Sequence, residues 1–284
     1  MIIYVLTTLL TIIILGLVGF DLIVVLLSYS IFWYETADRQ PDLIKKRFNR
    51  KNLQLVAVLI FSELFYDLLT LSSIPFGLIK KANPFLKRGE TPVLLLHGLF
   101  VNKASWFWFK YRLRQQGFNN VVTMNLSSWH NEEVLTELVA KKVDELRHQV
   151  GVNKINIVGH SMGGLIARNY IQLRGGSDKV ERLICLGSPH HGSKLAAFTL
   201  DPLGKLLVPN SDFLQRLNQA PIPENVATTN IYTCKDNMVL PNESCQIPWA
   251  QNIALDRMGH TALIYRKSAL TATVSALQQT TQKG

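Results

Sequence analysis

The chain has 284 residues, 48% of them hydrophobic, three cysteines and a formal net charge of +10 at pH 7. This length suffices for one α/β domain of ordinary size with an additional segment, and three cysteines are too few for a disulfide-dense secreted scaffold. No strip of interleaved aromatic and basic residues accompanies the positive charge, so we expect no nucleic-acid partner. Attraction to anionic lipid headgroups explains the charge more simply.

Residues 2–33 contain no charged residue other than Asp21 and are apolar almost throughout. This run exceeds the roughly 20 residues that cross a bilayer as a helix. No lysine or arginine precedes it and no small-residue cleavage site follows it, a pattern that favours a retained membrane anchor over a cleaved signal peptide. Because a carboxylate is costly in such a segment, Asp21 is expected to face another helix.

A basic loop follows the first apolar run, and its charged residues are Arg39, Lys45, Lys46, Arg47, Arg50 and Lys51 against Asp38 and Asp42. The positive-inside rule places this loop on the cytoplasmic face. A second apolar stretch, residues 53–79, carries Glu63, Asp67 and Thr70 at the i, i+4, i+7 spacing of one helical stripe. We interpret residues 1–88 as a membrane-anchoring helical region.

Three interpretations of the second apolar stretch remain open. It returns across the membrane, it lies in the interface as an amphipathic helix, or it packs on the following domain as an ordinary helix. Its length favours the first, which puts the rest of the chain outside the cytoplasm. Cys234 and Cys245 flank one loop and agree with this choice if they form a disulfide in an oxidising compartment, but two free thiols are an equally good interpretation.

Residues 80–90, with Pro84 and Gly89, are typical of a linker, and from there short apolar runs alternate with helical spacing. This alternation predicts parallel β-α units, and therefore an α/β domain over residues 89–284. The predicted strands are residues 91–97, 121–125, 154–160, 180–187, 229–234 and 253–255. The predicted helices are residues 104–116, 131–150, 162–174 and 261–277. Residues 193–226 are less regular and apolar in patches.

The segment Gly159-His160-Ser161-Met162-Gly163 joins a predicted strand to a predicted helix. Small residues at both ends allow a sharp strand-to-helix turn, which holds the serine in a strained conformation and exposes its hydroxyl above the sheet. Such a turn also directs a helix N-terminus at the serine. The pentapeptide alone is a modest signal, but the flanking strand and helix make Ser161 a candidate nucleophile.

A serine nucleophile needs a base, and the base needs an acid that holds its tautomer. In a doubly wound hydrolase the chain order is serine, acid, histidine. Asp236 follows a predicted strand and His260 begins the last predicted helix, so they are the predicted acid and base. Asp201 and Asp212 are rival acids, but neither ends a strand. The rival bases are His130, His148, His190 and His191.

The oxyanion of acyl transfer needs two preorganised backbone donors. One is expected from Met162, the residue after the nucleophile, and the other from the loop His97-Gly98-Leu99-Phe100 that follows the first strand, with Leu99 as the predicted donor. We predict no metal and no cofactor, because no cluster of carboxylates indicates a cation site. The neighbouring His190 and His191 point apart and are expected to form a turn beneath the nucleophile.

Four segments carry a resemblance to a known family. In chain order they are Pro92-Val93-Leu94-Leu95-Leu96-His97-Gly98, Gly159-His160-Ser161-Met162-Gly163-Gly164-Leu165, Gly187-Ser188-Pro189-His190-His191-Gly192-Ser193 and Gly259-His260. Together they resemble bacterial triacylglycerol lipases and esterases of the α/β-hydrolase fold over about residues 90–277. The resemblance implies the same nucleophile, acid, base and oxyanion donors, and it implies that residues 193–226 form a lid or cap over the acyl site.

The sequence therefore predicts a membrane-anchored serine hydrolase that cleaves carboxylic esters of acyl lipids through an acyl-enzyme. Its expected partners are an ester or lipid substrate and, through the N-terminal helices, membrane lipid. The expected location is the bacterial inner membrane with the catalytic domain facing the periplasm. Another acyl transfer on the same three residues is the alternative within enzymes, as thioesterase, amidase or acyltransferase. From another class, the alternative is a non-catalytic lipase-like chaperone module.

Overall fold

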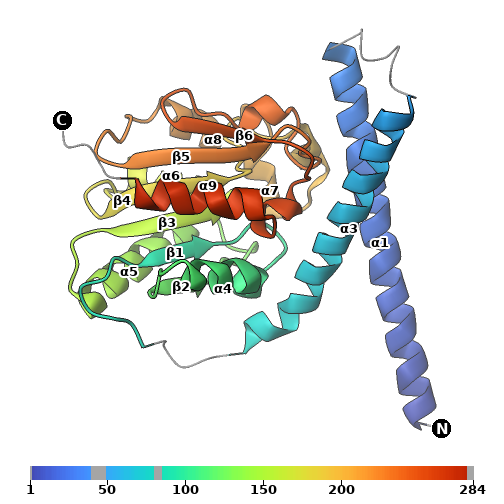
Figure 1. The fold of residues 1–284 in the computed structure, drawn as a ribbon, viewed down its shortest axis with the longest axis horizontal. Coiled ribbons are helices and arrows are strands. Elements are labelled where there is room, and N and C mark those ends of the chain that lie inside the picture. The colour runs from blue at the N-terminus through green and yellow to red at the C-terminus, as the bar shows by residue number, and fades with distance from the viewer. Residues whose placement is uncertain (1, 40–48, 80–84, 280–284) are drawn as a thin grey trace.

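Two long helices lie along one side of an α/β domain (Figure 1). The computed structural model describes residues 2–39, 49–79 and 85–279. Helix α1 (Ile2–Arg39) and helix α3 (Arg50–Leu78) run antiparallel, and α3 lies between α1 and the domain. Most of the predicted basic loop, residues 40–48, and the first part of the predicted linker, residues 80–84, lie outside the described residues.

The domain is built on one sheet of six parallel strands in the order β2-β1-β3-β4-β5-β6. The strands are β1 (Val93–Leu96), β2 (Val121–Met124), β3 (Ile155–His160), β4 (Val180–Leu186), β5 (Ala227–Thr233) and β6 (Gln251–Leu255). All six predicted strands are confirmed. Leu96 of β1 pairs with Gly159 of β3, so the loop after β1 lies beside the turn that carries Ser161.

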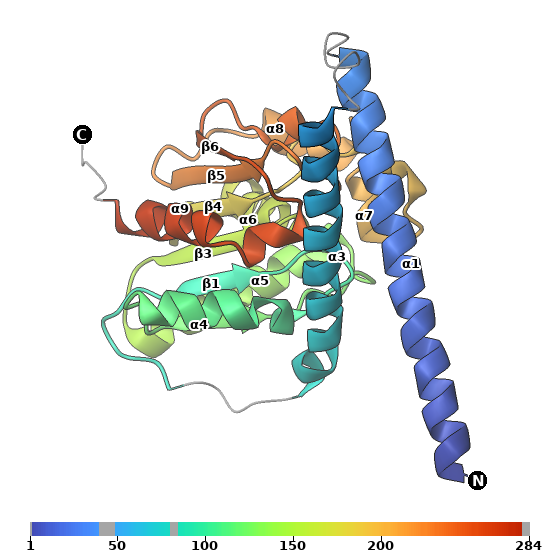
Figure 2. The same ribbon diagram turned by 45° about the vertical axis from the view of Figure 1, so that its right-hand side comes forward.

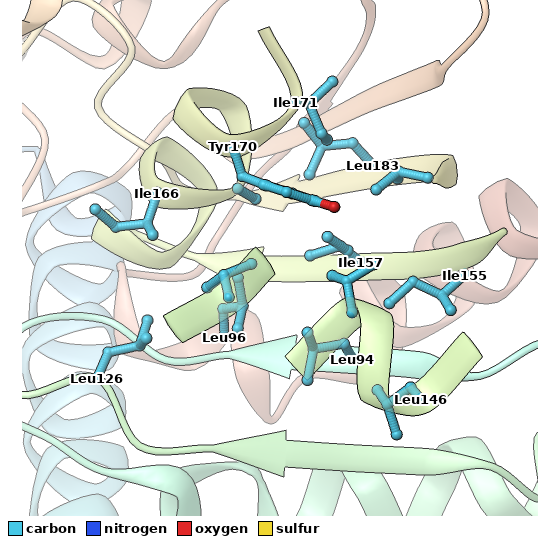
Figure 3. Close-up of a cluster of buried hydrophobic side chains, with 14 of the residues drawn as sticks. Leu94, Leu96, Leu126, Leu146, Ile155, Ile157, Ile166, Tyr170, Ile171 and Leu183 are labelled. Carbon is cyan, nitrogen blue, oxygen red and sulfur yellow. The ribbon is translucent and has the colours of Figure 1, made fainter. Parts of the chain in front are cut away.

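Helices cover both faces of the sheet, which explains why its central strands are continuously apolar. Successive residues of β1 point to opposite faces: Leu94 and Leu96 pack under α5 (Glu132–Val150) and α6 (Met162–Leu173), and Val93 and Leu95 pack under α4 (Phe107–Gln115) and α9 (Lys267–Gln278). Figure 3 shows the first of these two cores, with Tyr170 of α6 lying over the sheet. The sheet is thereby a rigid base for the loops at its carboxyl edge.

The last predicted helix, residues 261–277, is wrong as a single element. The chain forms a short 3₁₀ helix η4 (Thr261–Ile264), leaves helical geometry at Tyr265 and Arg266, and then begins α9. The break lets Tyr265 reach α3, where its ring stacks on Tyr66 with a centroid distance of 5.0 Å and its hydroxyl lies 2.7 Å from Thr70 Oγ1. Contacts with α3 therefore override the local helical pattern.

Helix α3 packs on the α/β domain, as the third interpretation of the second apolar stretch predicts. The polar stripe faces inward, since Glu63 and Thr70 are buried, and the opposite face exposes Phe61, Phe65 and Phe76. Helix α1 touches α3 and the domain only with its C-terminal part, through side chains such as Val25, and its residues 4–17 are exposed. Both helices are long and apolar enough to cross a bilayer.

Residues 193–226, the cap segment, fold into short helices above the carboxyl edge of the sheet. They are η2 (Lys194–Phe198), α7 (Pro202–Leu206) and α8 (Asp212–Gln219). Two further 3₁₀ turns, η1 (Lys103–Trp106) and η3 (Asn242–Cys245), complete the loops at this edge. In Figure 2 α1 passes in front of α7, and Lys194 of η2 lies 2.7 Å from Glu35 of α1, so the cap segment and the first helix are neighbours.

Candidate active site

Ser161 occupies the sharp turn between β3 and α6. Its backbone angles, φ 54° and ψ −125°, are strained for a residue with a side chain. A Cβ atom at Gly159 would overlap the backbone of Gly164, and one at Gly163 would overlap the carbonyl of Leu96. Only glycine at these two positions lets the strand and the helix pass this closely, which explains both glycines of the pentapeptide.

The structure brings Asp236 and His260 together in the loops after β5 and β6. His260 Nδ1 lies 2.8 Å from Asp236 Oδ2. The other oxygen of this fully buried carboxylate accepts hydrogen bonds from the N–H groups of Met238 and Val239, at 2.9 and 2.8 Å. Three donors therefore fix the carboxylate, and its bond to Nδ1 leaves Nε2 of the imidazole as the proton acceptor.

Two opposing effects set the pKa of His260. Burial lowers it, but the charge of Asp236, the hydrogen bond to Asp236 and the charge of Asp67 raise it, and the net result is a pKa above the ordinary value of 6.5. A raised pKa makes the imidazole a stronger base toward a hydroxyl proton.

Ser161 and His260 line the same cavity of about 260 Å³, here called the catalytic cavity. Within the described residues no hydrogen bond joins the Ser161 hydroxyl to the His260 ring; such contacts are often long without substrate and tighten in the complex. The predicted nucleophile, acid and base thus share one site. The predicted oxyanion donors adjoin it: Leu99 lines the cavity and Met162 is the first residue of α6.

The loop that carries Leu99 is held against the serine by His97. A Cβ atom at Gly98 would lie 3.0 Å from the Ser161 Cβ, so only glycine allows this approach without displacement. His97 Nδ1 donates to the Gly98 carbonyl at 2.8 Å, and its Nε2 accepts from the Leu126 N–H at 2.9 Å. Burial lowers the pKa of His97 to about 4, which keeps this neutral tautomer at physiological pH.

His160, next to the serine, is also neutral. Burial and the nearby His260 hold its pKa well below the ordinary value, and its Nε2 lies 3.2 Å from the His260 carbonyl oxygen. Because a carbonyl only accepts, the proton of His160 is on Nε2. His160 therefore supports the backbone of the predicted base.

The rival candidates lie elsewhere. Asp201 caps α7 by accepting from Gly204 N at 2.8 Å, and Asp212 is in the first turn of α8. His190 is buried beside Arg168, 3.2 Å from its guanidinium. His130 and His148 are exposed. Among the residues that the structure describes, no group of three His, Cys, Asp or Glu side chains is arranged to hold a metal ion.

The free cysteines remove one argument for an oxidising compartment. Cys234 is exposed, Cys245 is buried, and both are thiols rather than a disulfide. Cys185 is buried in β4 as predicted, and burial raises the pKa of its thiol to about 12. A thiol with such a pKa is a packing residue rather than a nucleophile.

Helix α3 contributes to this site, which the sequence did not predict. Glu63 is fully buried, and its carboxylate accepts hydrogen bonds from the N–H groups of Thr261 and Ala262, directly after His260. A Cβ atom at Gly259 would overlap this carboxylate, which explains the glycine of the Gly259-His260 motif. The polar stripe of Glu63, Asp67 and Thr70 on an apolar helix indicated that these side chains have partners. The sequence does not indicate which residues the partners are.

Helix α1 reaches the same loop through Ser28. Asn237 Nδ2 donates to Ser28 Oγ at 2.9 Å, and Asn237 Oδ1 accepts from the backbone N–H of His260 at 3.2 Å. Asp21 of α1 and Asp67 of α3 also line the catalytic cavity. Both N-terminal helices thus contact the loops of the site, and Asp21 faces the domain as well as a second helix.

Comparisons with known proteins agree with this architecture. A family model described as the alpha/beta hydrolase fold matches residues 91–210. Lipase B of Aspergillus fumigatus superposes with a TM-score of 0.57 at 19% identity, covering 71% of this chain and 55% of that one. At this identity the likeness shows the fold alone.

Several curated proteins share sequence with the chain. A triacylglycerol lipase of Pseudomonas fragi is 31% identical over 150 residues, which are 47% of this chain and 50% of that protein. A probable alcohol acetyltransferase of Saccharomyces cerevisiae is 26% identical over 167 residues, 54% of this chain and 40% of that protein. The chain thus spans half or less of the length of these relatives.

Proposed function

Because the chain has the α/β-hydrolase fold and resembles bacterial triacylglycerol lipases, we propose that it is a serine hydrolase that cleaves carboxylic esters of acyl lipids. The observation that carries the proposal is that Ser161, on its strained turn, lines one cavity with His260, whose ring is bonded to the Asp236 carboxylate. A serine on a strained turn that lines a cavity together with an oriented imidazole is the arrangement that acyl transfer requires.

In the proposed reaction Ser161 Oγ attacks the ester carbonyl carbon while His260 Nε2 takes the hydroxyl proton. The Asp236 carboxylate stabilises the resulting imidazolium through Nδ1–H. Backbone N–H groups of Leu99 and Met162 stabilise the oxyanion, each contributing about 3 kcal/mol. The C–O bond then breaks, and the leaving alcohol takes the proton from His260. In the second half of the reaction water attacks the acyl carbon while His260 takes its proton. The bond to Ser161 breaks, Ser161 regains a proton from His260, and the carboxylic acid leaves.

A lipid substrate is supported by the surroundings of the site. Helix α1 exposes a long apolar surface, and both N-terminal helices meet the catalytic cavity. Such helices are suited to membrane attachment, which would hold the serine close to acyl lipids. The bacterial inner membrane is the proposed location.

Replacement of the nucleophile tests the mechanism. We expect Ser161→Ala to lower p-nitrophenyl ester turnover by a factor of at least about 10⁴, since only oxyanion stabilisation and binding remain. A matched control is Ser275→Ala, on the exposed side of α9, which should keep wild-type turnover. Turnover by Ser161→Ala near that of the wild type would refute the mechanism, and failure of the wild type to react with a fluorophosphonate would favour a non-catalytic module.

A second candidate is acyl transfer to an alcohol instead of water, favoured by the match to a probable alcohol acetyltransferase. The acyl-enzyme is common to both reactions, and the acceptor decides the product. Turnover of one ester with increasing ethanol separates them: hydrolysis gives mainly free acid, and alcoholysis gives mainly the ethyl ester.

A further inference from the structure

A second, larger cavity of about 1310 Å³ lies between α1 and the α/β domain. Its wall on α1 includes Phe20, Val24 and Leu27, and its opposite wall includes Trp129 from the loop after β2 and Leu200 of the cap segment. This volume exceeds the roughly 300–1,000 Å³ of common small-molecule pockets, so the cavity is large enough for a long flexible ligand. We call it the α1 groove.

The α1 groove adjoins the catalytic cavity. Six residues line both: Val24, Phe100, Val101, Leu195, Thr199 and Met238. All of them except Thr199 are apolar. A ligand whose carbonyl carbon meets Ser161 can therefore extend its apolar part across this boundary into the groove.

The mouth of the groove is apolar where it meets the outside. Phe198 and Leu200 of the cap segment line the groove and are 76% and 93% exposed. On α1, Leu27 lines the same opening and is 57% exposed. Contiguous large apolar side chains around an opening are unfavourable in water and typical of contact with lipid.

We propose that the α1 groove binds the acyl chain of the substrate and that α1 is its membrane-side wall. This inference rests on the proposed ester hydrolysis and adds to it that the anchoring helix selects the acyl chain. The lipid enters sideways from the bilayer between α1 and the cap segment, with its ester carbonyl leading toward Ser161. An acyl chain that enters this way replaces its contacts with other lipids by contacts with the apolar side chains of α1 and the domain.

A photoreactive probe tests the groove in the full-length protein. The probe is an alkyl fluorophosphonate with a diazirine near the end of a long chain, applied to the protein in lipid nanodiscs. We expect covalent attachment at Ser161 and, after illumination, cross-links to residues 20–31 of α1 or to the loop 125–130. Attachment at Ser161 with cross-links confined to other segments would refute acyl-chain binding in the α1 groove but would still support the proposed hydrolase. Absence of attachment at Ser161 would overturn both proposals.

Chain-length preference gives a second, independent readout. Each methylene buried in the groove should raise kcat/KM about fourfold. We expect Val24→Trp, which narrows the boundary between the cavities, to lower the ratio of kcat/KM for octanoyl over acetyl p-nitrophenyl ester at least tenfold. The matched control Ile23→Trp, on the exposed side of α1, should keep the wild-type ratio in the same detergent. Equal ratios in the two variants would contradict the proposal.

Discussion

His260 is held by contacts at three of its atoms. Asp236 bonds Nδ1, Asn237 accepts from the backbone N–H, and His160 donates to the backbone carbonyl. His160 is neutral because of its burial, so it supports the loop without adding a positive charge beside the base. The pKa of His260 is consequently governed by burial, which lowers it, and by the acidic groups, which raise it more.

The pH dependence of turnover follows from this balance. The base acts only when neutral, so kcat/KM should rise as pH increases through the pKa of His260, with its midpoint above about 6.5. Asp236→Asn removes the charge that raises the pKa of His260 most, while burial still lowers this pKa, so the midpoint of the pH profile should move to lower pH. The rate should also fall by about 10⁴, because the carboxylate no longer fixes the tautomer of the His260 ring. The pH profile of p-nitrophenyl acetate turnover measures both. An unchanged midpoint would show that another group titrates.

At the scale of elements, α3 acts as a support for the catalytic loop. An apolar helix that buries a carboxylate must provide it with donors, and the N–H groups of Thr261 and Ala262 meet this need. The same contacts satisfy the first turn of η4, which would otherwise leave its amides unpaired. Further along α3, Thr70 bonds Tyr265, and Tyr66 stacks on the same ring. The position of His260 therefore depends on a helix that precedes it by about 200 residues.

Glu63 is thus a positioning residue, and its replacement has a distinctive signature. We expect Glu63→Ala to lower kcat at least tenfold with a small change in KM, because two buried N–H groups lose their acceptor at a cost of about 1–3 kcal/mol each and the histidine loop shifts. Glu63→Gln keeps a carbonyl oxygen and should restore part of kcat. Ser72→Ala, on the exposed face of α3, is the control. A change in KM alone, or no recovery in Glu63→Gln, would count against positioning.

The sequence predicted the parts of the fold that local patterns determine. Apolar runs located the strands, and the chain order of serine, acid and histidine pointed to Ser161, Asp236 and His260. In the structure Ser161 and His260 line one cavity, and Asp236 bonds the His260 ring. The partner of Glu63 was not predictable, because a polar stripe on a helix shows that a partner exists but not which of many backbone amides it is. The break at Tyr265 has the same origin, since a contact with α3 overrides the local helical spacing.

At the scale of the whole molecule, the exposed apolar surface is concentrated on one side. Residues 4–17 of α1 are exposed, and the outward face of α3 carries aromatic side chains such as Phe61 and Phe65. The α1 groove opens on this side of the molecule. A bilayer that covers these surfaces would therefore also cover the route to Ser161 that we propose.

Lysines introduced in the exposed part of α1, residues 4–17, should impair membrane binding without impairing ester turnover. Each lysine near the centre of a membrane helix costs about 2.5–3.5 kcal/mol, so Leu10→Lys with Ile14→Lys should abolish co-sedimentation with vesicles of zwitterionic phosphatidylcholine, which do not attract the added charges. Turnover of p-nitrophenyl acetate should stay near wild type, because these side chains are exposed and distant in sequence from the contact region of α1. Leu10→Ala with Ile14→Ala should still bind. Retained sedimentation of the lysine variant would argue against insertion of α1.

The carboxylate of Glu63 also has a consequence for the timing of synthesis. A chain is made from its N-terminus, so Ser28 and Glu63 exist long before residues 236–262, which they support. Until those late residues arrive, the two helices carry polar groups without their final partners. If the proposed mechanism holds, a growing chain therefore carries Ser161 before it carries the acid and base that would activate it.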